Sequence, residues 1–213
     1  MATGRRKRSA TKTSARTRGS RRRSPARPAP SAPLESALVA FADLAKRLRL
    51  RWYVFGAQAV NLLGYPRATA DLDVTVDLAA RDPMTFVAAL DKAGFEPRFR
   101  DRDFIMAARV IPLVHRASAL PIDVVLAGPG LEQQFLEEVV VTELGGRRIP
   151  ILSRENLIVT KVIAGRERDL EDVRELLARA PAVDHAKIGS LLGAVDEALG
   201  TNDLAERYRR LRS

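Results

Sequence analysis

Three aspartates, in two widely separated stretches of the chain, have the spacing and surroundings of metal-binding or catalytic carboxylates. Asp71 and Asp73 lie in the segment RATADLDVTVD (67–77), where aliphatic and polar residues alternate. In a β-strand alternate side chains share a face, which puts both carboxylates on one side with Cα atoms about 7 Å apart. Two ionised carboxylates at this range repel each other unless a cation lies between them.

The third aspartate, Asp123, interrupts the otherwise apolar segment LPIDVVLA (120–127). This pattern predicts a buried strand, in which a lone charge costs several kcal/mol unless it is paired or bound to metal. If this strand lies beside the first, three carboxylates converge. Mg²⁺ or Mn²⁺ suits such oxygen ligands, and three carboxylates suffice for a two-metal site. The alternative for Asp71 and Asp73 is a solvated polar strand face.

A second chemical feature lies upstream of the aspartates. The segment VFGAQAVN (54–61) predicts a strand, a tight turn at Gly56 and a helix. Backbone N–H groups and the helix dipole at such a helix start favour a phosphate group. Many strand–helix turns contain glycine, so the turn alone is weak support. Its position before Asp71 would let it hold a triphosphate over metal ions bound by the aspartates.

The elements that must position these residues follow from periodicity and turn signals. Outside one hairpin, strands are predicted at 51–55, 71–77, 103–110 and 120–127. Helices are predicted from 34, at 57–63, 83–94 and 131–139, then at 154–164, 168–180, 184–199 and 203–211. The hairpin spans 139–152 with Gly145 and Gly146 at its turn, and Ser153 is the expected N-cap of the next helix. We therefore expect an α+β (or α/β) fold, with a mixed β-sheet flanked by helices and a C-terminal helical portion.

Charge is concentrated at the N-terminus. The 213 residues carry a formal net charge of +10, yet the first 33 hold eleven Lys and Arg and no acidic residue. The remainder, with 25 basic and 26 acidic residues, is close to neutral. Few apolar residues are available for burial in 1–33, which predicts a disordered Arg/Pro-rich tail. Such a tail attracts nucleic-acid phosphates non-specifically, or else acts as a solubilising extension.

Several classes of protein are excluded. The sequence has no cysteine, so disulfides and thiolate metal sites are ruled out. It has no run of about 18 apolar residues, and its basic N-terminus lacks the apolar segment of a secretory signal. We expect a cytoplasmic protein without membrane contact. The expected organisation is a tail at 1–33, a core at 34–152 and a helical region at 153–213 that packs on the core.

The segment FGAQAVNLLGYPRATADLDVTVD (55–77) resembles the minimal nucleotidyltransferases of the DNA polymerase β superfamily. Within them it is similar to the group of AbiEii-type toxins of bacterial toxin–antitoxin systems and related uncharacterised nucleotidyltransferases. A second match lies in SRENLIVTKVIAGRERDLEDV (153–173). The resemblance covers about residues 37–178. The matching residues are Gly56, Ala57, Gly64, Arg67, Thr69, Asp71, Asp73, Lys161, Arg168, Asp169, Leu170 and Asp172.

The resemblance implies a role for each candidate residue. Asp71, Asp73 and Asp123 would bind Mg²⁺ (or Mn²⁺), and Asp123 would also help to deprotonate the acceptor hydroxyl. The implied nucleotide-binding residues are Gly56, Ala57, Arg67, Thr69 and Asp169. Lys161 would reach a phosphate or pair with Asp169. The implied reaction moves a nucleoside monophosphate from an NTP to a hydroxyl of RNA or protein and releases pyrophosphate, with an antitoxin as an implied partner.

Alternatives remain open at this stage. Active members of the group often have Ser where this chain has Ala57, so a catalytically weak or inactive relative is also consistent with the sequence. Such a relative would be a nucleotide- or partner-binding module with a tail that tethers nucleic acid. Three residues have structural alternatives. For Arg67 the alternative is to hold the entry to its strand, for Lys161 to extend to the surface, and for Asp169 to act as a first-turn acid of its helix.

Overall fold

The computed structural model describes residue 1 and residues 31–65, 67–179 and 182–212. Most of the predicted tail lies outside these residues. The first helix, α1 (Ala32–Leu48), begins two residues before its predicted start, with Pro33 in its first turn. Proline is favoured there because its missing N–H would be unpaired in any case and its φ suits a helix.

The described residues form one seven-stranded sheet in the order β3-β4-β5-β2-β1-β7-β6. The three central strands are β5 (Leu120–Leu126), β2 (Leu72–Asp77) and β1 (Arg51–Phe55). The flanking strands are β3 (Phe95–Pro97), β4 (Val110–His115), β7 (Arg147–Ile151) and β6 (Val140–Leu144). β2 pairs with β5, and β1 with β7, in parallel, whereas the other neighbours are antiparallel. The predicted mixed sheet is confirmed.

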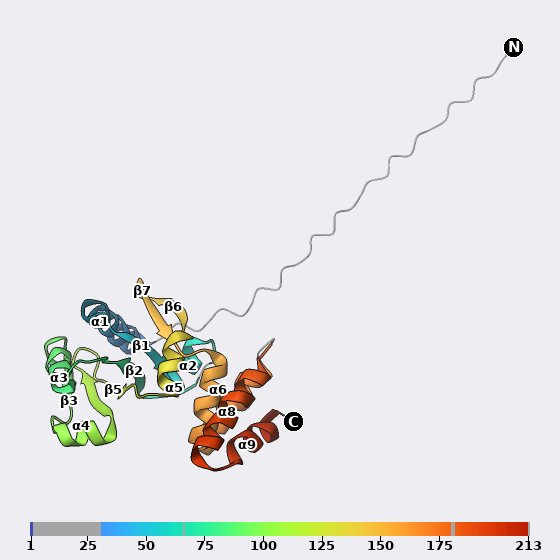
Figure 1. The fold of residues 1–213 in the computed structure, drawn as a ribbon. Coiled ribbons are helices and arrows are strands. Elements are labelled where there is room, and N and C mark those ends of the chain that lie inside the picture. The colour runs from blue at the N-terminus through green and yellow to red at the C-terminus, as the bar shows by residue number, and fades with distance from the viewer. Residues whose placement is uncertain (2–30, 66, 180–181, 213) are drawn as a thin grey trace.

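Helices flank the sheet and follow its last strand (Figure 1). Those within the sheet region are α2 (Gly56–Leu62), α3 (Pro83–Lys92), α4 (Arg102–Ala108) and α5 (Leu131–Glu137). The C-terminal helices are α6 (Arg154–Ala164), α7 (Glu167–Ala178), α8 (His185–Leu199) and α9 (Asp203–Arg212). Figure 1 shows α8 and α9 on the opposite side of the molecule from α3 and α4. The predicted α+β class is therefore confirmed.

Burial follows the alternation in the strands. Leu72, Val74 and Val76 are fully buried on one face of β2, as their spacing predicts. Trp52 of β1 is buried on the same face, opposite Val76, and α1 packs over it through Phe41, whose ring meets that of Trp52 edge-on at 5.0 Å. Packing on this face holds β1, β2 and β5 in place and leaves the aspartates on the other face.

The predicted strand at 103–110 is wrong. Residues 102–108 form α4, and β4 begins only at Val110. The helix is capped at both ends: the side chain of Asp101 accepts a hydrogen bond from Phe104 N at 2.7 Å, and Arg109 ends it with a left-handed φ of 54°. The periodicity of the short apolar run between these caps fits a strand as well as a helix, and the Asp101 cap favours the helix. β3 was not predicted at all.

Other local signals are confirmed. Ser153 caps α6 by accepting from Asn156 N at 3.3 Å, and Gly165 ends the helix with a φ of 65°. Gly145 and Gly146 have φ values of 54° and 70° and form the tight turn between β6 and β7. In such a hairpin both turn residues need positive φ, which glycine adopts without strain.

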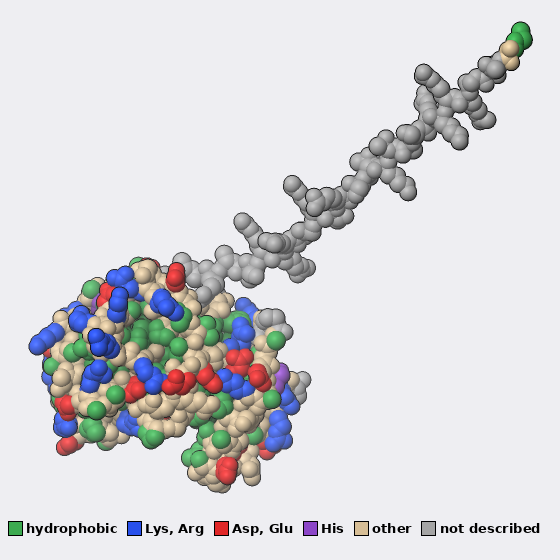
Figure 2. Space-filling view, turned by 45° about the horizontal axis from the view of Figure 1, so that its top comes forward, with side chains coloured by type: hydrophobic (Ala, Val, Ile, Leu, Met, Phe, Trp, Pro, Cys, Tyr) green, Lys and Arg blue, Asp and Glu red, His purple; other side chains and the backbone are tan. Residues whose placement is uncertain are grey.

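The surface of the folded region is mixed in charge. Figure 2 shows Lys and Arg side chains interspersed with Asp and Glu side chains on the face in view. This agrees with the near-neutral balance that the sequence has beyond the tail. Among the described residues, no helix is both long enough and apolar enough to cross a membrane.

Candidate active site

The sheet brings two of the candidate carboxylates side by side. Asp73 of β2 and Asp123 of β5 are direct partners in the parallel register of these strands. Asp71 precedes β2 by one residue and is exposed at its start. The predicted neighbourhood of the two aspartate-bearing strands is therefore confirmed.

Gly56 lies against Asp73 because β1 and β2 are antiparallel neighbours with Phe55 opposite Asp73. Gly56 has a φ of +64°, and a Cβ atom built on it would lie 2.0 Å from Asp73 Oδ2. Any other residue would collide with this carboxylate, so the glycine serves first to admit Asp73. The helix that follows, α2, starts at Gly56 itself, and no side chain caps its first turn.

The carboxylates repel one another in a partly buried setting. Burial raises the pKa of Asp73 to about 6, with further contributions from the charges of Asp71 and Asp123, against the opposing effect of Lys161 and Arg166. Burial and the charge of Asp71 also raise the pKa of Asp123. Within the described part of the chain, neither Asp73 nor Asp123 forms a side-chain hydrogen bond or an ion pair.

These side chains fit a magnesium ion in a limited way. Across the described ranges, no three His, Asp or Glu side chains are grouped closely enough to form a complete metal cluster. Mg²⁺, however, is commonly held by one or two carboxylates, with the remaining positions filled by water and substrate phosphates. The adjacent pair Asp73 and Asp123 provides that minimum. Asp73 forms no ion pair with a described side chain, so its carboxylate is available to bind a metal ion.

A cationic group stands opposite the carboxylates. Lys161 of α6 is only 4% exposed, and its Nζ lies 2.5 Å from Asp172 Oδ2 and 3.1 Å from Asp169 Oδ1. Arg166, which precedes α7, lies 3.9 Å from the second oxygen of Asp169. Lys161 therefore does not extend to the surface, and its predicted pairing with Asp169 is present.

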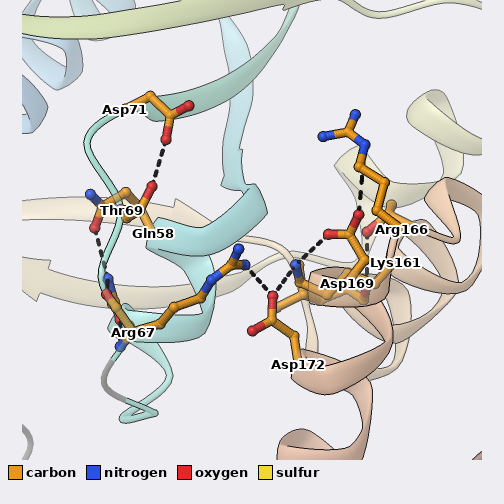
Figure 3. Close-up of polar contacts among 11 residues, drawn as sticks. Gln58, Arg67, Thr69, Asp71, Lys161, Arg166, Asp169 and Asp172 are labelled. Atoms are coloured by element: carbon orange, nitrogen blue, oxygen red, sulfur yellow. Dashed lines mark hydrogen bonds and ion pairs between the residues drawn. The ribbon is translucent and has the colours of Figure 1, made fainter.

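Arg67 is joined to the same group (Figure 3). Its guanidinium reaches across from the loop before β2 to Asp172 on α7, so Asp172 is shared by Arg67 and Lys161. The backbone of Arg67 is also fixed, because Asn61 of α2 accepts from its N–H at 2.6 Å and donates to its carbonyl at 2.9 Å. These contacts support the structural reading of Arg67, which holds the entry to β2.

Thr69 acts on the first aspartate. Its Oγ1 donates a hydrogen bond of 2.5 Å to Asp71 Oδ1, as Figure 3 shows. A hydrogen bond to one oxygen limits the rotation of the carboxylate and leaves the other oxygen open. In the structure Thr69 therefore positions Asp71, while its predicted contact with a nucleotide stays a prediction.

All of the predicted site residues line one open cavity of about 690 Å³. One wall carries the aspartates and the turn at Gly56 and Ala57, and the other carries Lys161 with the α6–α7 junction. A volume of this size is typical of small-molecule and cofactor sites. The cavity thus places a wall of aspartates opposite a wall of mixed charge, which carries Lys161, Arg166 and Arg168 together with Glu167 and Asp169. The predicted residues on its lining are Gly56, Ala57, Arg67, Thr69, Asp71, Asp73, Asp123, Lys161 and Asp169.

Two contributors were not foreseen in these roles. Asp172 appears in the sequence motif only as an acid of α7, and its sharing between two cations depends on tertiary contacts that no local pattern reveals. Asn61 had no sequence signal, since its role is a pair of hydrogen bonds to the backbone of Arg67. Arg166 and Arg168 also line the cavity.

Comparison with known proteins identifies the fold. Neither a protein-family model nor a curated protein sequence matches the chain. Among solved structures, an antigenic nucleotidyltransferase-like protein from Paracoccidioides brasiliensis aligns with a TM-score of 0.54 and 14% identity, over 85% of this chain and 94% of that one. The antibiotic-resistance factor ANT(2'')-Ia aligns with a TM-score of 0.54 and 13% identity, over 78% and 93%.

These likenesses define the class of fold. The chain has a nucleotidyltransferase-like fold. The cavity is lined by residues between Phe55 and Asp169, which belong to the sheet region and to the α6–α7 junction. A second structure of ANT(2'')-Ia, in complex with adenylyl-2''-tobramycin, aligns with a TM-score of 0.53 and 14% identity, over 78% and 98%. At these identities the likeness carries the fold alone.

Proposed function

We propose that this protein is a metal-dependent nucleotidyltransferase of the DNA polymerase β superfamily. In the proposed reaction an acceptor hydroxyl oxygen attacks the α-phosphorus of an NTP. The new P–O bond joins the nucleoside monophosphate to the acceptor, the bond to the β-phosphate oxygen breaks, and pyrophosphate leaves. The proton of the hydroxyl passes to a carboxylate of the site.

Unpaired carboxylates that face cationic side chains across one cavity carry this proposal. Asp73 and Asp123 are adjacent, partly buried and without a cationic partner, whereas Lys161 and Arg166 stand on the facing wall. A metal-bound triphosphate needs this combination, with carboxylates on the metal side and cations on the phosphate side. Phosphoryl-type transfer depends mainly on positioning and charge neutralisation, which such a cavity can supply.

Each residue has a proposed role. The pair Asp73 and Asp123 would hold Mg²⁺ (or Mn²⁺), which when bound neutralises phosphate charge. Asp71 would join them as a third ligand by turning its other carboxylate oxygen toward the ion. Asp123 is also the proposed proton acceptor, because it lines the cavity directly beside Asp73. The proposed nucleotide contacts are Gly56, Ala57, Arg67, Thr69, Lys161 and Asp169.

The finer assignment is to the AbiEii-type group, with an RNA or protein hydroxyl as acceptor. It rests on the sequence motifs described above and would make the protein a cytoplasmic toxin with an antitoxin partner. The tail would then tether nucleic acid through its eleven basic residues.

The decisive experiment is label transfer from each of the four α-labelled NTPs to total RNA or protein, with and without Mg²⁺. We expect the Asp71→Ala/Asp73→Ala variant to lose transfer by at least about a thousandfold, because both proposed metal ligands are gone. Glu197→Ala, which removes an exposed carboxylate of α8, is the matched control and should transfer normally. If the wild type labels no acceptor and binds no nucleotide in a metal-dependent way, the proposal fails.

Ala57 favours one second candidate. At this position the hydroxyl found in active relatives is missing, which suits a module that binds a nucleotide or a partner without transferring a nucleotide. This candidate predicts metal-dependent NTP binding by calorimetry with no label transfer. Ala57→Ser would then raise transfer from nothing to a measurable rate.

A further inference from the structure

Two phenylalanine rings are exposed beside the candidate active site. Phe99 and Phe104 are 49% and 43% exposed, whereas four of the other five phenylalanines are buried and the fifth is half buried. The two rings lie 5.3 Å apart at an angle of 51°, and Met106 on the same helix is 52% exposed. We call Phe99 and Phe104 the aromatic pair. Exposed apolar clusters on soluble proteins commonly mark binding surfaces.

The aromatic pair lies on the side of Asp123 that faces away from the Lys161 wall. Arg98 N donates to the carbonyl of Pro112 at 2.9 Å, and Pro112 is the register partner of Asp123 across β4 and β5. Adjacent strands are about 4.8 Å apart, so the backbone of Arg98 lies roughly 10 Å from that of Asp123. Phe99 follows directly. The order across this surface is therefore Asp123, Arg98 and the aromatic pair.

Arg98 is the cation beside the aromatic pair that can bind an anionic group. Residues 98–109 contain four arginines and two aspartates. Arg100 and Arg102 pair with Asp91 and Asp82. In the part of the chain that the structure describes, the guanidinium of Arg98 has no hydrogen bond and no ion pair, and its charge favours the ionised form of Asp123.

We propose that the aromatic pair and Arg98 bind the end of a single-stranded nucleic acid, which is the acceptor of the proposed transfer. This inference rests on the proposed function and specifies its acceptor. The bases stack on Phe99 and Phe104, a backbone phosphate lies near Arg98, and the terminal sugar hydroxyl points to Asp123. Hydroxyl, phosphate and base thus match, in order, the groups found on the surface. Aromatic rings bind bases of any sequence, because every base has a π-face.

The experiment separates base stacking from simple apolar contact. Short single-stranded RNA and DNA oligonucleotides, fluorescently labelled at the 5′ end, are titrated with the full chain, and anisotropy is read at low and high salt. Phe99→Leu/Phe104→Leu keeps the apolar area and removes the rings, whereas Phe99→Tyr/Phe104→Tyr keeps the rings. Leu199→Ala, which alters an exposed leucine of α8 outside this surface, is the matched control. All variants retain the tail, so its contribution is the same in each.

We expect the leucine variant to bind the oligonucleotide about tenfold more weakly or worse, most clearly at high salt, where the charge-dependent part of binding is reduced. The tyrosine variant and Leu199→Ala should bind as the wild type does. In transfer assays the leucine variant should raise the KM for the oligonucleotide and leave the KM for the NTP unchanged. A preference for RNA over DNA, if present, identifies which strand is the acceptor within the proposal.

Two results would overturn the inference. One is equal oligonucleotide affinity of the leucine variant and the wild type. The other is label transfer to protein alone that the leucine variant retains, which indicates apolar docking of a polypeptide. Failure of the proposed function looks different: the wild type labels no acceptor, while the loss of oligonucleotide binding in the leucine variant still reports on the aromatic pair.

Discussion

At the scale of single residues, Asp73 stands out because it is ionised at neutral pH in a place that opposes ionisation. Its pKa is raised from 3.8 to about 6 by burial first and by the neighbouring aspartates second. Between pH 4 and 6 the folded chain therefore binds more protons than the unfolded chain at this residue. By linkage, the contribution of Asp73 to stability falls as pH rises through this window and stays unfavourable above it.

Asp73→Asn should therefore stabilise the folded protein at pH 7.5, by about 1–3 kcal/mol, since the amide carries no charge. Urea unfolding followed by circular dichroism measures the difference. The gain should shrink as the pH is lowered towards 4, where the native aspartate is protonated. A variant that is less stable than the wild type at pH 7.5 would contradict this reading of Asp73.

The same residue offers a metal test that does not depend on activity. If Asp73 is a ligand, Mg²⁺ should raise the melting temperature of the wild type at pH 7.5, because a ligand that binds only the folded state stabilises it. Asp73→Asn should respond much less to Mg²⁺. Equal responses of the two proteins would exclude Asp73 as a ligand.

Asp172 is the residue whose loss should harm the fold most directly. It is 8% exposed and accepts from both Arg67 and Lys161, so its removal leaves a buried lysine with one acid in place of two. Asp172→Asn should lower the free energy of unfolding by about 2–4 kcal/mol, as breaking buried ion pairs does.

The matched control for Asp172→Asn is Glu171→Gln, the exposed neighbour on α7. It should change the unfolding free energy by less than about 0.5 kcal/mol, the range of ordinary surface substitutions. Urea denaturation of both variants gives the comparison. If both variants lose a similar amount of unfolding free energy, the ion pairs of Asp172 contribute no more to stability than an ordinary surface residue does.

At the scale of elements, the meeting of β1, β2 and α2 depends on one glycine. Gly56 and Gly200 have nearly the same backbone, with φ values of +64° and +66°, but only Gly56 has a carboxylate where a Cβ would lie. Alanine at either position should cost about 1–2 kcal/mol for the left-handed backbone. Gly56→Ala should lose more than Gly200→Ala, because Asp73 must also move, and it should lose nucleotide binding. Thermal unfolding and NTP titration measure the two effects.

The elements also show where sequence reasoning works. Strand β2, the hairpin at Gly145 and Gly146, and the Ser153 cap follow from local rules that the tertiary structure does not override. The strand predicted at 103–110 is wrong because its few apolar residues fit the period of a helix as well as that of a strand. Asp101 was the cap signal that favours the helix. In the site, the aspartates were predictable from their chemical oddity in strands. The sharing of Asp172 was not, since it joins segments more than a hundred residues apart.

At the scale of the whole molecule, charge is divided between the tail and a nearly neutral remainder. Deletion of residues 1–30 removes all eleven basic residues of the tail and leaves the Ser31 cap position and Pro33 of α1 in place. We expect the deletion to leave the melting temperature unchanged. The affinity of the shortened protein for nucleic acid should fall much less steeply with rising salt concentration, because fewer counterions are released on binding. An unchanged salt slope, measured by anisotropy, would exclude the tail as a tether.

The order of the site residues along the chain has a consequence for protein synthesis. The aspartates up to Asp123 are made first, and Asp172 follows only after α6, about 2 to 10 seconds later at ordinary translation rates. Lys161 and Arg67 find their shared partner only at that point. A polypeptide that ends in between carries Asp73 and Asp123 but lacks the acid that holds Arg67 and Lys161 together. The cavity is therefore assembled only once α7 has been made.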